Sequence, residues 1–120
     1  MEFGTIRNFI NGKWEESKLR EVHEIKNPAL NEVIAELPWS GKEEVDRAVQ
    51  AAKEAFPEWR RTTPPSRDRY LFRLKELLEE NFEDLAIIQT KEVGKTIDEA
   101  RADVKEGPWI AQRGGDQETQ

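Results

Sequence analysis

The hydrophobic period of this 120-residue sequence changes near residue 40, and that change most constrains the fold. Before it, apolar residues fall in short runs interrupted by Asn, Gly and Pro, as in short strands and turns. After it, apolar residues recur three or four positions apart, as on one face of an amphipathic helix. The sequence therefore predicts an α+β fold in which short antiparallel strands precede about four amphipathic helices.

Residues 1–39 form the predicted strand region, which begins with a hairpin. Asn11 and Gly12 suit the two positive φ angles of a type I′ turn between short strands. Two further extended segments, 21–28 and 31–38, each end at a proline. The residues between them favour local backbone hydrogen bonds, so we expect a turn there.

Residues 40–107 form the predicted helical region. Ser40 and Glu43 match a capping box for the first helix, and Pro57 indicates its end. Thr63, followed by two prolines, is expected to cap the second helix, which runs to about residue 80. The residues expected to face the core are Val45, Ala48, Val49, Ala52, Phe56, Leu71, Leu74, Leu77, Leu78, Leu85, Ile88, Ile97, Ala100 and Val104, with the aromatic residues Phe9, Trp14, Trp59, Tyr70, Phe72 and Phe82.

The third and fourth predicted helices meet at "EVGKT", residues 92–96, whose Gly-Lys-Thr is also found in phosphate-binding loops. A P-loop requires another glycine five positions before the second one and a strand leading into the loop. Gln89 occupies that position, and helical residues precede it. We therefore interpret the motif as a helix corner, in which Gly94 ends one helix and Thr96 with Glu99 caps the next.

The fourth helix is expected to stop at Gly107–Pro108, because glycine favours helix ends and proline lacks a backbone N–H. Residues 108–120 show no periodicity, and we interpret them as a disordered or non-native tail. The opening pentapeptide "MEFGT" is likewise interpreted as foreign to the natural sequence. On this interpretation the natural polypeptide is longer than the sequence.

Composition argues against several classes of function. The net charge is −6 and basic residues are interleaved with acidic ones, so no basic stripe for nucleic acid is expected. The sequence has no cysteine for disulfides, thiolate metal sites or nucleophilic catalysis. It has no signal-like or membrane-spanning run, so a cytoplasmic protein with no membrane partner is expected. Abundant Glu, Lys and Arg with one Met are typical of proteins from hot environments.

Acidic pairs and the single histidine do not predict an active site. Adjacent residues on a helix do not face each other, so we expect the acidic pairs to be solvated. These pairs are Glu15–Glu16, Glu79–Glu80 and Glu83–Asp84. His23 has no second His or Cys as a metal-binding partner and is expected at the surface. The residues themselves therefore predict no catalytic, cofactor-binding or metal-ligating side chain.

The order of five segments resembles the N-terminal part of the NAD(P)-dependent aldehyde dehydrogenase superfamily. These segments are "NFINGKW", "KNPALNEVIAELP", "KEEVDRAVQAAKEAFPEWR", "SRDRYLFRLKELLEENFEDLA" and "EVGKTIDEARADV", within about residues 8–107. The wording of "AFPEWR" and "LFRLKELLEEN" is most similar to the methylmalonate-semialdehyde dehydrogenase branch, which is coenzyme A acylating. The resemblance implies a fragment of a larger α/β fold in which the "EVGKT" turn is structural.

The resemblance places the family's chemistry outside this chain. In family members the dinucleotide fold, the catalytic cysteine, the general-base glutamate and the oxyanion-hole asparagine lie beyond the position of residue 107. NAD(P), with coenzyme A as a co-substrate, is thus implied for a full-length parent and not for this chain. Some relatives hold a monovalent cation with backbone carbonyls that correspond here to Ile25, Lys26 and Glu92.

Two hypotheses about function stay open at this point. In the first, the chain is a non-catalytic N-terminal fragment of an aldehyde dehydrogenase that binds the rest of the enzyme or another copy of itself. In the second, it is an autonomous helical module that binds a protein partner through its apolar stripes. The presence of a downstream dinucleotide fold in the parent gene would distinguish them.

Overall fold

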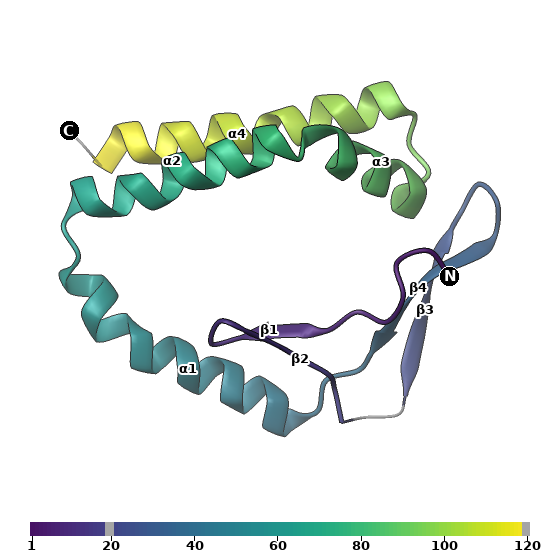
Figure 1. The fold of residues 1–120 in the computed structure, drawn as a ribbon, viewed down its shortest axis with the longest axis horizontal. Helices are drawn as coiled ribbons and strands as arrows, with labels where there is room; N and C mark the ends of the chain where they lie inside the picture. Colours follow the sequence, from purple (N-terminus) through teal and green to yellow (C-terminus); the bar gives the residue numbers. More distant parts are fainter. Residues whose placement is uncertain (19–20, 119–120) are drawn as a thin grey trace. The chain divides into compact units, whose positions relative to one another are not determined.

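The structure, a computed structural model, describes residues 1–18 and 21–118. The chain divides into two compact units, Met1–Arg61 and Thr62–Gln120. In the described residues the first unit holds β1 to β4 and α1, and the second holds α2 to α4 (Figure 1). The predicted α+β class is confirmed. The boundary between the units follows α1 instead of preceding it, because α1 contacts β1.

Strands β1 (Asn8–Ile10) and β2 (Lys13–Glu15) form the predicted antiparallel hairpin. Asn11 has φ 51° and Gly12 has φ 77° at the turn between them. Two consecutive positive φ angles match the twist of a two-residue hairpin turn, and Asn-Gly adopts them at low cost. This local prediction is confirmed.

Strands β3 (Val22–Asn27) and β4 (Glu32–Pro38) form a second antiparallel pair. At the turn, the Asn27 side-chain oxygen accepts a hydrogen bond from the Ala29 N–H at 2.9 Å, and Asn31 has φ 55°. Both features are local asparagine chemistry of the kind the sequence predicted.

The N-terminal segment lies along β4. The Phe3 N–H donates to the Ile34 carbonyl and the Ile6 N–H to the Glu36 carbonyl, each at 2.8 Å. The Glu36 N–H in turn donates to the Gly4 carbonyl at 3.1 Å. The pentapeptide that we interpreted as foreign is therefore paired with the second sheet.

Helix α1 (Lys42–Arg61) begins one residue later than its predicted capping box. Its first carbonyl acceptor is Gly41, and the Glu44 carboxylate accepts the Gly41 N–H at 2.7 Å. Ser40 does not cap the helix, because its hydroxyl accepts a hydrogen bond at 2.8 Å from the side-chain amide of Asn8, the first residue of β1. The prediction of a Ser40–Glu43 box is therefore wrong by one position.

The predicted end of α1 is also wrong, because the helix includes Pro57 and continues for one more turn to Arg61. A proline inside a helix removes one backbone hydrogen bond and costs about 3 kcal/mol. The alanine-rich sequence before it offsets part of that cost. Trp59, expected on the core side, is exposed.

Helices α2 (Pro64–Glu80) and α3 (Phe82–Val93) have the predicted bounds within a residue or two. Thr63 takes the N-cap position with prolines directly after it, as predicted. Its hydroxyl donates to the Ser66 hydroxyl at 3.0 Å and accepts no hydrogen bond from a backbone N–H of the helix. Asn81 separates the two helices, and its side chain donates to the Leu77 carbonyl at 2.8 Å.

Helix α4 (Ile97–Glu118) runs through Gly107 and Pro108, which were expected to end it. Pro108 is buried, and a Cβ atom added at Gly107 would lie 3.6 Å from the Leu78 Cδ1 atom on α2. Packing of α4 on α2 thus keeps the chain helical despite the missing N–H. The expected disorder is wrong for residues 108–118, and residues 119 and 120 lie outside the described part.

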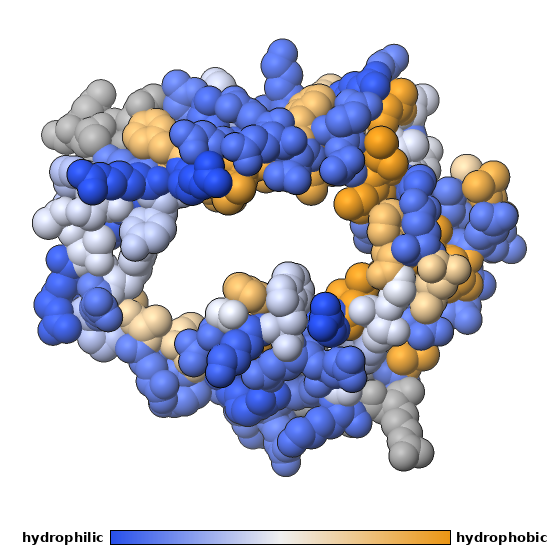
Figure 2. Space-filling view, in the orientation of Figure 1, coloured by the Kyte–Doolittle hydropathy of each residue, from blue (hydrophilic) through white to orange (hydrophobic). Residues whose placement is uncertain are grey.

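Small side chains dominate the buried core of the described residues. The buried apolar residues are Ile34 and Ala35 in the first unit and Ala86, Ala100 and Pro108 in the second. The expected core role is wrong for a large group of apolar side chains that are exposed: Phe9, Trp14, Val45, Val49, Phe56, Trp59, Tyr70, Phe72, Leu74, Leu77 and Ile88. Figure 2 shows orange, hydrophobic residues at the surface of the helical unit. Exposed apolar surface of this kind marks interaction surfaces.

Candidate functional site

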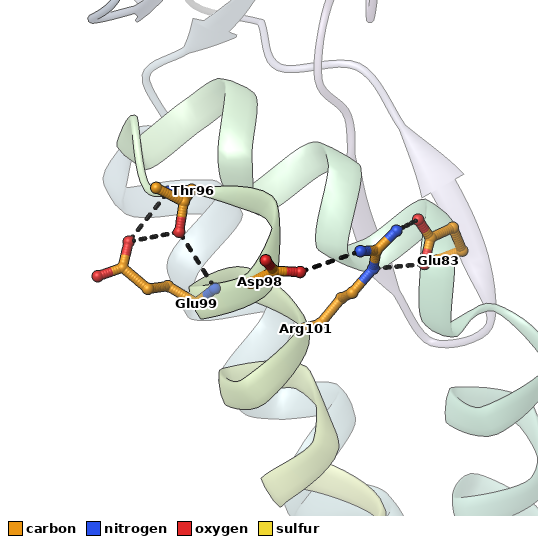
Figure 3. A network of polar contacts seen from close by, with 5 residues as sticks. All are labelled: Glu83, Thr96, Asp98, Glu99 and Arg101. Carbon is orange, nitrogen blue, oxygen red and sulfur yellow. Dashed lines mark hydrogen bonds and ion pairs between the residues drawn. The ribbon is translucent and has the colours of Figure 1, made fainter.

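The corner between α3 and α4 is built as the sequence predicted. Gly94 caps α3 in the left-handed conformation, with φ 78°, and its N–H donates to the Thr90 carbonyl at 2.9 Å. The Thr96 N–H donates to the Glu99 carboxylate at 3.0 Å, and the Glu99 N–H donates to the Thr96 hydroxyl oxygen at 3.3 Å (Figure 3). The Thr96 hydroxyl also donates to the Glu99 carboxylate. The hydrogen bonds from the Thr96 hydroxyl and the Thr96 N–H lower the pKa of Glu99.

The lysine of the Gly-Lys-Thr sequence is paired within the protein. Lys95 forms an ion pair with Asp103 on α4, and the Gln89 amide donates to the same carboxylate at 2.7 Å. The hydrogen bond from the Lys95 ammonium group to the Asp103 carboxylate raises the pKa of Lys95 and lowers the pKa of Asp103. In a phosphate-binding loop the lysine must reach the phosphate, and the backbone N–H groups of the loop must be free to donate hydrogen bonds to it. Here the Gly94 and Thr96 N–H groups already have acceptors, so the corner acts as a structural clamp.

A second ion pair joins the start of α3 to α4. The Arg101 guanidinium donates to both oxygens of Glu83, at 3.1 and 2.6 Å, and to Asp98 at 3.2 Å (Figure 3). Hydrogen bonding by Arg101 lowers the pKa of Glu83. Glu83 was expected to be solvated, and it is exposed but paired. Its partner lies 18 residues away on another helix, so no local pattern could have indicated it.

A buried carboxylate that the sequence did not indicate lies at the start of α1. Glu44 accepts hydrogen bonds from the Gly41 N–H at 2.7 Å, the Lys18 N–H at 3.0 Å and the Ser17 hydroxyl at 3.1 Å. The backbone donors, Gly41 first, lower the pKa of Glu44. A carboxylate held ionised by three donors is a poor proton acceptor, so its role is to fix the start of the helix and the preceding loop. The sequence feature that could have indicated this cap is Gly41, three residues before Glu44.

The other predicted residues lie apart from these clusters. His23 is exposed, with its ring centroid 6.3 Å from that of Trp39, as expected for a surface position. Of the acidic pairs, Glu15 forms an ion pair with Arg47 at 2.8 Å. Among the described residues, no group of three or more His, Cys, Asp or Glu could hold a metal ion. No described helix is long and apolar enough to cross a membrane.

The three carbonyls implied for a monovalent cation belong to different units. Ile25 and Lys26 lie on β3 in the first unit, and Glu92 lies in the last turn of α3 in the second. Neither unit therefore contains a complete site. The cation remains an implication of the resemblance.

Comparison with known proteins places these features in a family. The sequence profile of the aldehyde dehydrogenase family matches residues 14–113, which extends six residues beyond the expected end at residue 107. The chain is 48% identical to malonate-semialdehyde dehydrogenase 2 of Bacillus mycoides and 47% identical to that of Geobacillus kaustophilus, each over 103 residues. These matches cover 86% of this chain and 21% of each relative, so the chain spans about a fifth of their length.

Solved structures give the same relationship. A NAD-dependent benzaldehyde dehydrogenase from Corynebacterium glutamicum matches 95% of this chain with a TM-score of 0.90 and 30% identity, over 25% of its own length. A methylmalonate-semialdehyde dehydrogenase assigned by similarity in Sinorhizobium meliloti, solved with NAD, matches 93% of this chain with a TM-score of 0.84 and 34% identity, over 22% of its own length. The resemblance to this superfamily and to its semialdehyde branch is confirmed.

Proposed function

The chain belongs to the aldehyde dehydrogenase family, and on that premise we propose that it is the N-terminal segment of an NAD(P)-dependent aldehyde dehydrogenase and has no activity alone. The observation that supports this most directly is coverage. The chain matches relatives along most of its own length but along only about a fifth of theirs. Its Gly-Lys-Thr corner, the one phosphate-like motif in the sequence, is engaged in internal contacts.

The chemistry of aldehyde oxidation supports the absence of activity. A covalent route requires an activated thiolate, a base for the deacylating step and a bound nicotinamide placed to accept hydride. The chain has no cysteine. The Glu44 carboxylate accepts the Gly41 N–H, and the Glu83 carboxylate is paired with Arg101, so both are engaged in structural contacts. We therefore assign NAD(P) binding and catalysis to the full-length parent.

Similarity to malonate-semialdehyde and methylmalonate-semialdehyde dehydrogenases supports a semialdehyde as the parent's substrate. Coenzyme A as the acyl acceptor is part of the same proposal. A cytoplasmic location is part of the same proposal. Abundant Glu, Lys and Arg with one Met support a heat-adapted source.

Exposed apolar side chains support the proposed partners, which are the rest of the enzyme or another copy of the chain. Leu74 and Leu77 on α2 and Ile88 on α3 are exposed although they form the apolar stripes of their helices. The same observation favours the alternative, an autonomous protein-binding module without enzymatic activity.

Two assays on the purified chain test the proposal. Isothermal titration with NAD should show no saturable binding, and absorbance should show no NADH formed from propanal or methylmalonate semialdehyde. Joining the chain to a malonate-semialdehyde dehydrogenase that lacks its matching segment should restore turnover. Micromolar NAD binding or turnover by the chain alone would refute the proposal, and an inactive but folded fusion would favour the module.

A further inference from the structure

The edge of β4 that faces away from β3 binds the N-terminal segment, residues 3–6, through backbone groups (Figure 1). The Glu36 N–H donates to the Gly4 carbonyl at 3.1 Å, and the Glu36 carbonyl accepts the Ile6 N–H at 2.8 Å. Thr5 therefore lies opposite Glu36 as its parallel bridge partner. The segment is added to the sheet in the way that sheet edges bind extended peptides.

The pairing of the N-terminal segment is close to balance with its release. A third hydrogen bond runs from the Phe3 N–H to the Ile34 carbonyl at 2.8 Å, so the backbone groups of Ile34 and Glu36 together form the β4 edge. The net gain from one such bond is about as large as the entropic cost of ordering one residue, so three bonds alone do not hold four ordered residues. Side-chain burial adds only part of its full value, because Phe3 is 36% exposed and Ile6 is 39% exposed.

A single residue, Arg7, connects the paired segment to the next strand. Ile6 is bonded to β4, whereas Asn8 is already the first residue of β1, which belongs to the other two-stranded sheet. So short a connection allows the segment to reach its own β4 in only a narrow range of backbone conformations. Short hinges of this kind favour the exchange of an end segment between two copies, because the connection can then extend.

We infer that the β4 edge also binds the N-terminal segment of a second copy of this chain, so that two copies exchange residues 3–6 and form a dimer. The structure identifies the occupant, because residues 3–6 already make these bonds and a second copy presents the same residues. When the segment is released, the backbone groups of Ile34 and Glu36 become an open sheet edge, which recruits another strand. This surface is separate from the apolar stripes of the helices, and the inference does not depend on the proposed function.

Cysteine cross-linking tests the exchange without background, because the sequence has no cysteine. Thr5→Cys and Glu36→Cys are made as separate variants, one of them isotopically labelled, and are mixed, incubated and then oxidised. Neighbouring strands lie about 4.7–4.9 Å apart, a separation that a disulfide spans. We expect a disulfide between position 5 of one copy and position 36 of the other, identified by mass spectrometry. The control replaces Glu36→Cys by Glu32→Cys, an exposed position on β4 before the paired residues, and should give about tenfold less product.

A double variant gives the reverse test. In Thr5→Cys with Glu36→Cys, oxidation at low concentration forms a disulfide within one chain and locks the segment onto its own β4. The locked chain should show a dimer fraction about tenfold lower than the same variant kept reduced, measured by analytical ultracentrifugation after concentration. Leu77→Ser is included in every variant to reduce association through the exposed helix stripes.

A change in hinge length tests the same exchange without cysteine. A glycine insertion after Arg7 should lower the dimer fraction, because a longer connection lets the segment reach its own β4 freely. The same insertion after Met1 leaves the hinge unchanged and should leave the dimer fraction unchanged.

Three results would overturn the inference. They are disulfides at position 36 no more abundant than at position 32, equal dimer fractions for the locked and the reduced double variant, and equal effects of the two glycine insertions. Each assay measures the association of purified chains and none measures NAD binding or turnover, so such a failure would leave the proposed function standing.

Discussion

Replacing Gly107 by alanine distinguishes a continuous α4 from a helix that ends at residue 107. In the structure Gly107 lies inside α4, and an added Cβ would lie 3.6 Å from the Leu78 Cδ1 atom, an ordinary van der Waals contact. Alanine is favoured over glycine in a helix interior by about 0.5–1 kcal/mol. Because no atom has to move, we expect the free energy of unfolding to rise by about that amount, or the melting temperature by about 2–5 °C.

The assay is urea unfolding followed by circular dichroism, with the slope compared between variants to confirm that the same surface unfolds. Gly94→Ala is the control with the opposite sign. Gly94 has φ 78°, so a Cβ atom there costs about 1–2 kcal/mol, partly offset by lower entropy of the unfolded chain. Destabilisation by Gly107→Ala, at a size similar to Gly94→Ala, would refute the continuous helix and restore the expected end.

Three other predictions follow from the same contacts. The pKa values of Glu83, Glu99 and Asp103 are lowered, so their contribution to stability should be complete above about pH 4 and disappear as acid titrates them. The pKa of Lys95 is raised, so its contribution should be complete below about pH 10 and disappear at higher pH. Unfolding midpoints measured from pH 2 to 11 test both the acid and the alkaline loss of stability. If the Asp103→Asn variant loses stability at high pH as the unmodified chain does, the Lys95–Asp103 pair is contradicted. Glu44→Ala should lower the helix content measured by circular dichroism, because the Gly41 and Lys18 N–H groups lose their shared acceptor, whereas an unchanged helix content would exclude the cap. Light scattering should show self-association of the chain, reduced when the exposed Leu77 is replaced by serine; a compact monomer that binds no hydrophobic dye would contradict the exposed stripes.

Local chemistry in the sequence was sufficient for the turns and for the corner at residues 92–96. Asn11–Gly12, Gly94 and the Thr96–Glu99 box each act within a few residues, through a backbone φ angle or a side chain that reaches a nearby N–H. Such features do not depend on the rest of the molecule. The family was indicated differently, by the resemblance of five segments in their order along the chain to the N-terminal part of aldehyde dehydrogenases.

Features that depend on distant partners could not be derived in this way. The pairing of Arg101 with Glu83 requires α3 and α4 to be side by side. The pairing of Lys95 with Asp103 depends on how the corner before α4 directs the lysine along that helix, and spacing along one helix specifies neither contact. The cap of α1 moved to Gly41 because the hydroxyl of the expected cap residue binds a strand. These contacts also explain why a plausible phosphate-binding sequence is a structural clamp.

The largest differences between the predicted and the observed structure concern helix ends and the burial of apolar side chains. Both depend on packing against a second element. The sequence by itself determined which residues are apolar, which face of each helix they share and where proline weakens the backbone. Only the tertiary structure decided that packing on α2 carries α4 through Pro108. It also decided that Phe56, Leu74 and Leu77 stay exposed, because burial requires a second surface and the described residues supply one mainly for small side chains.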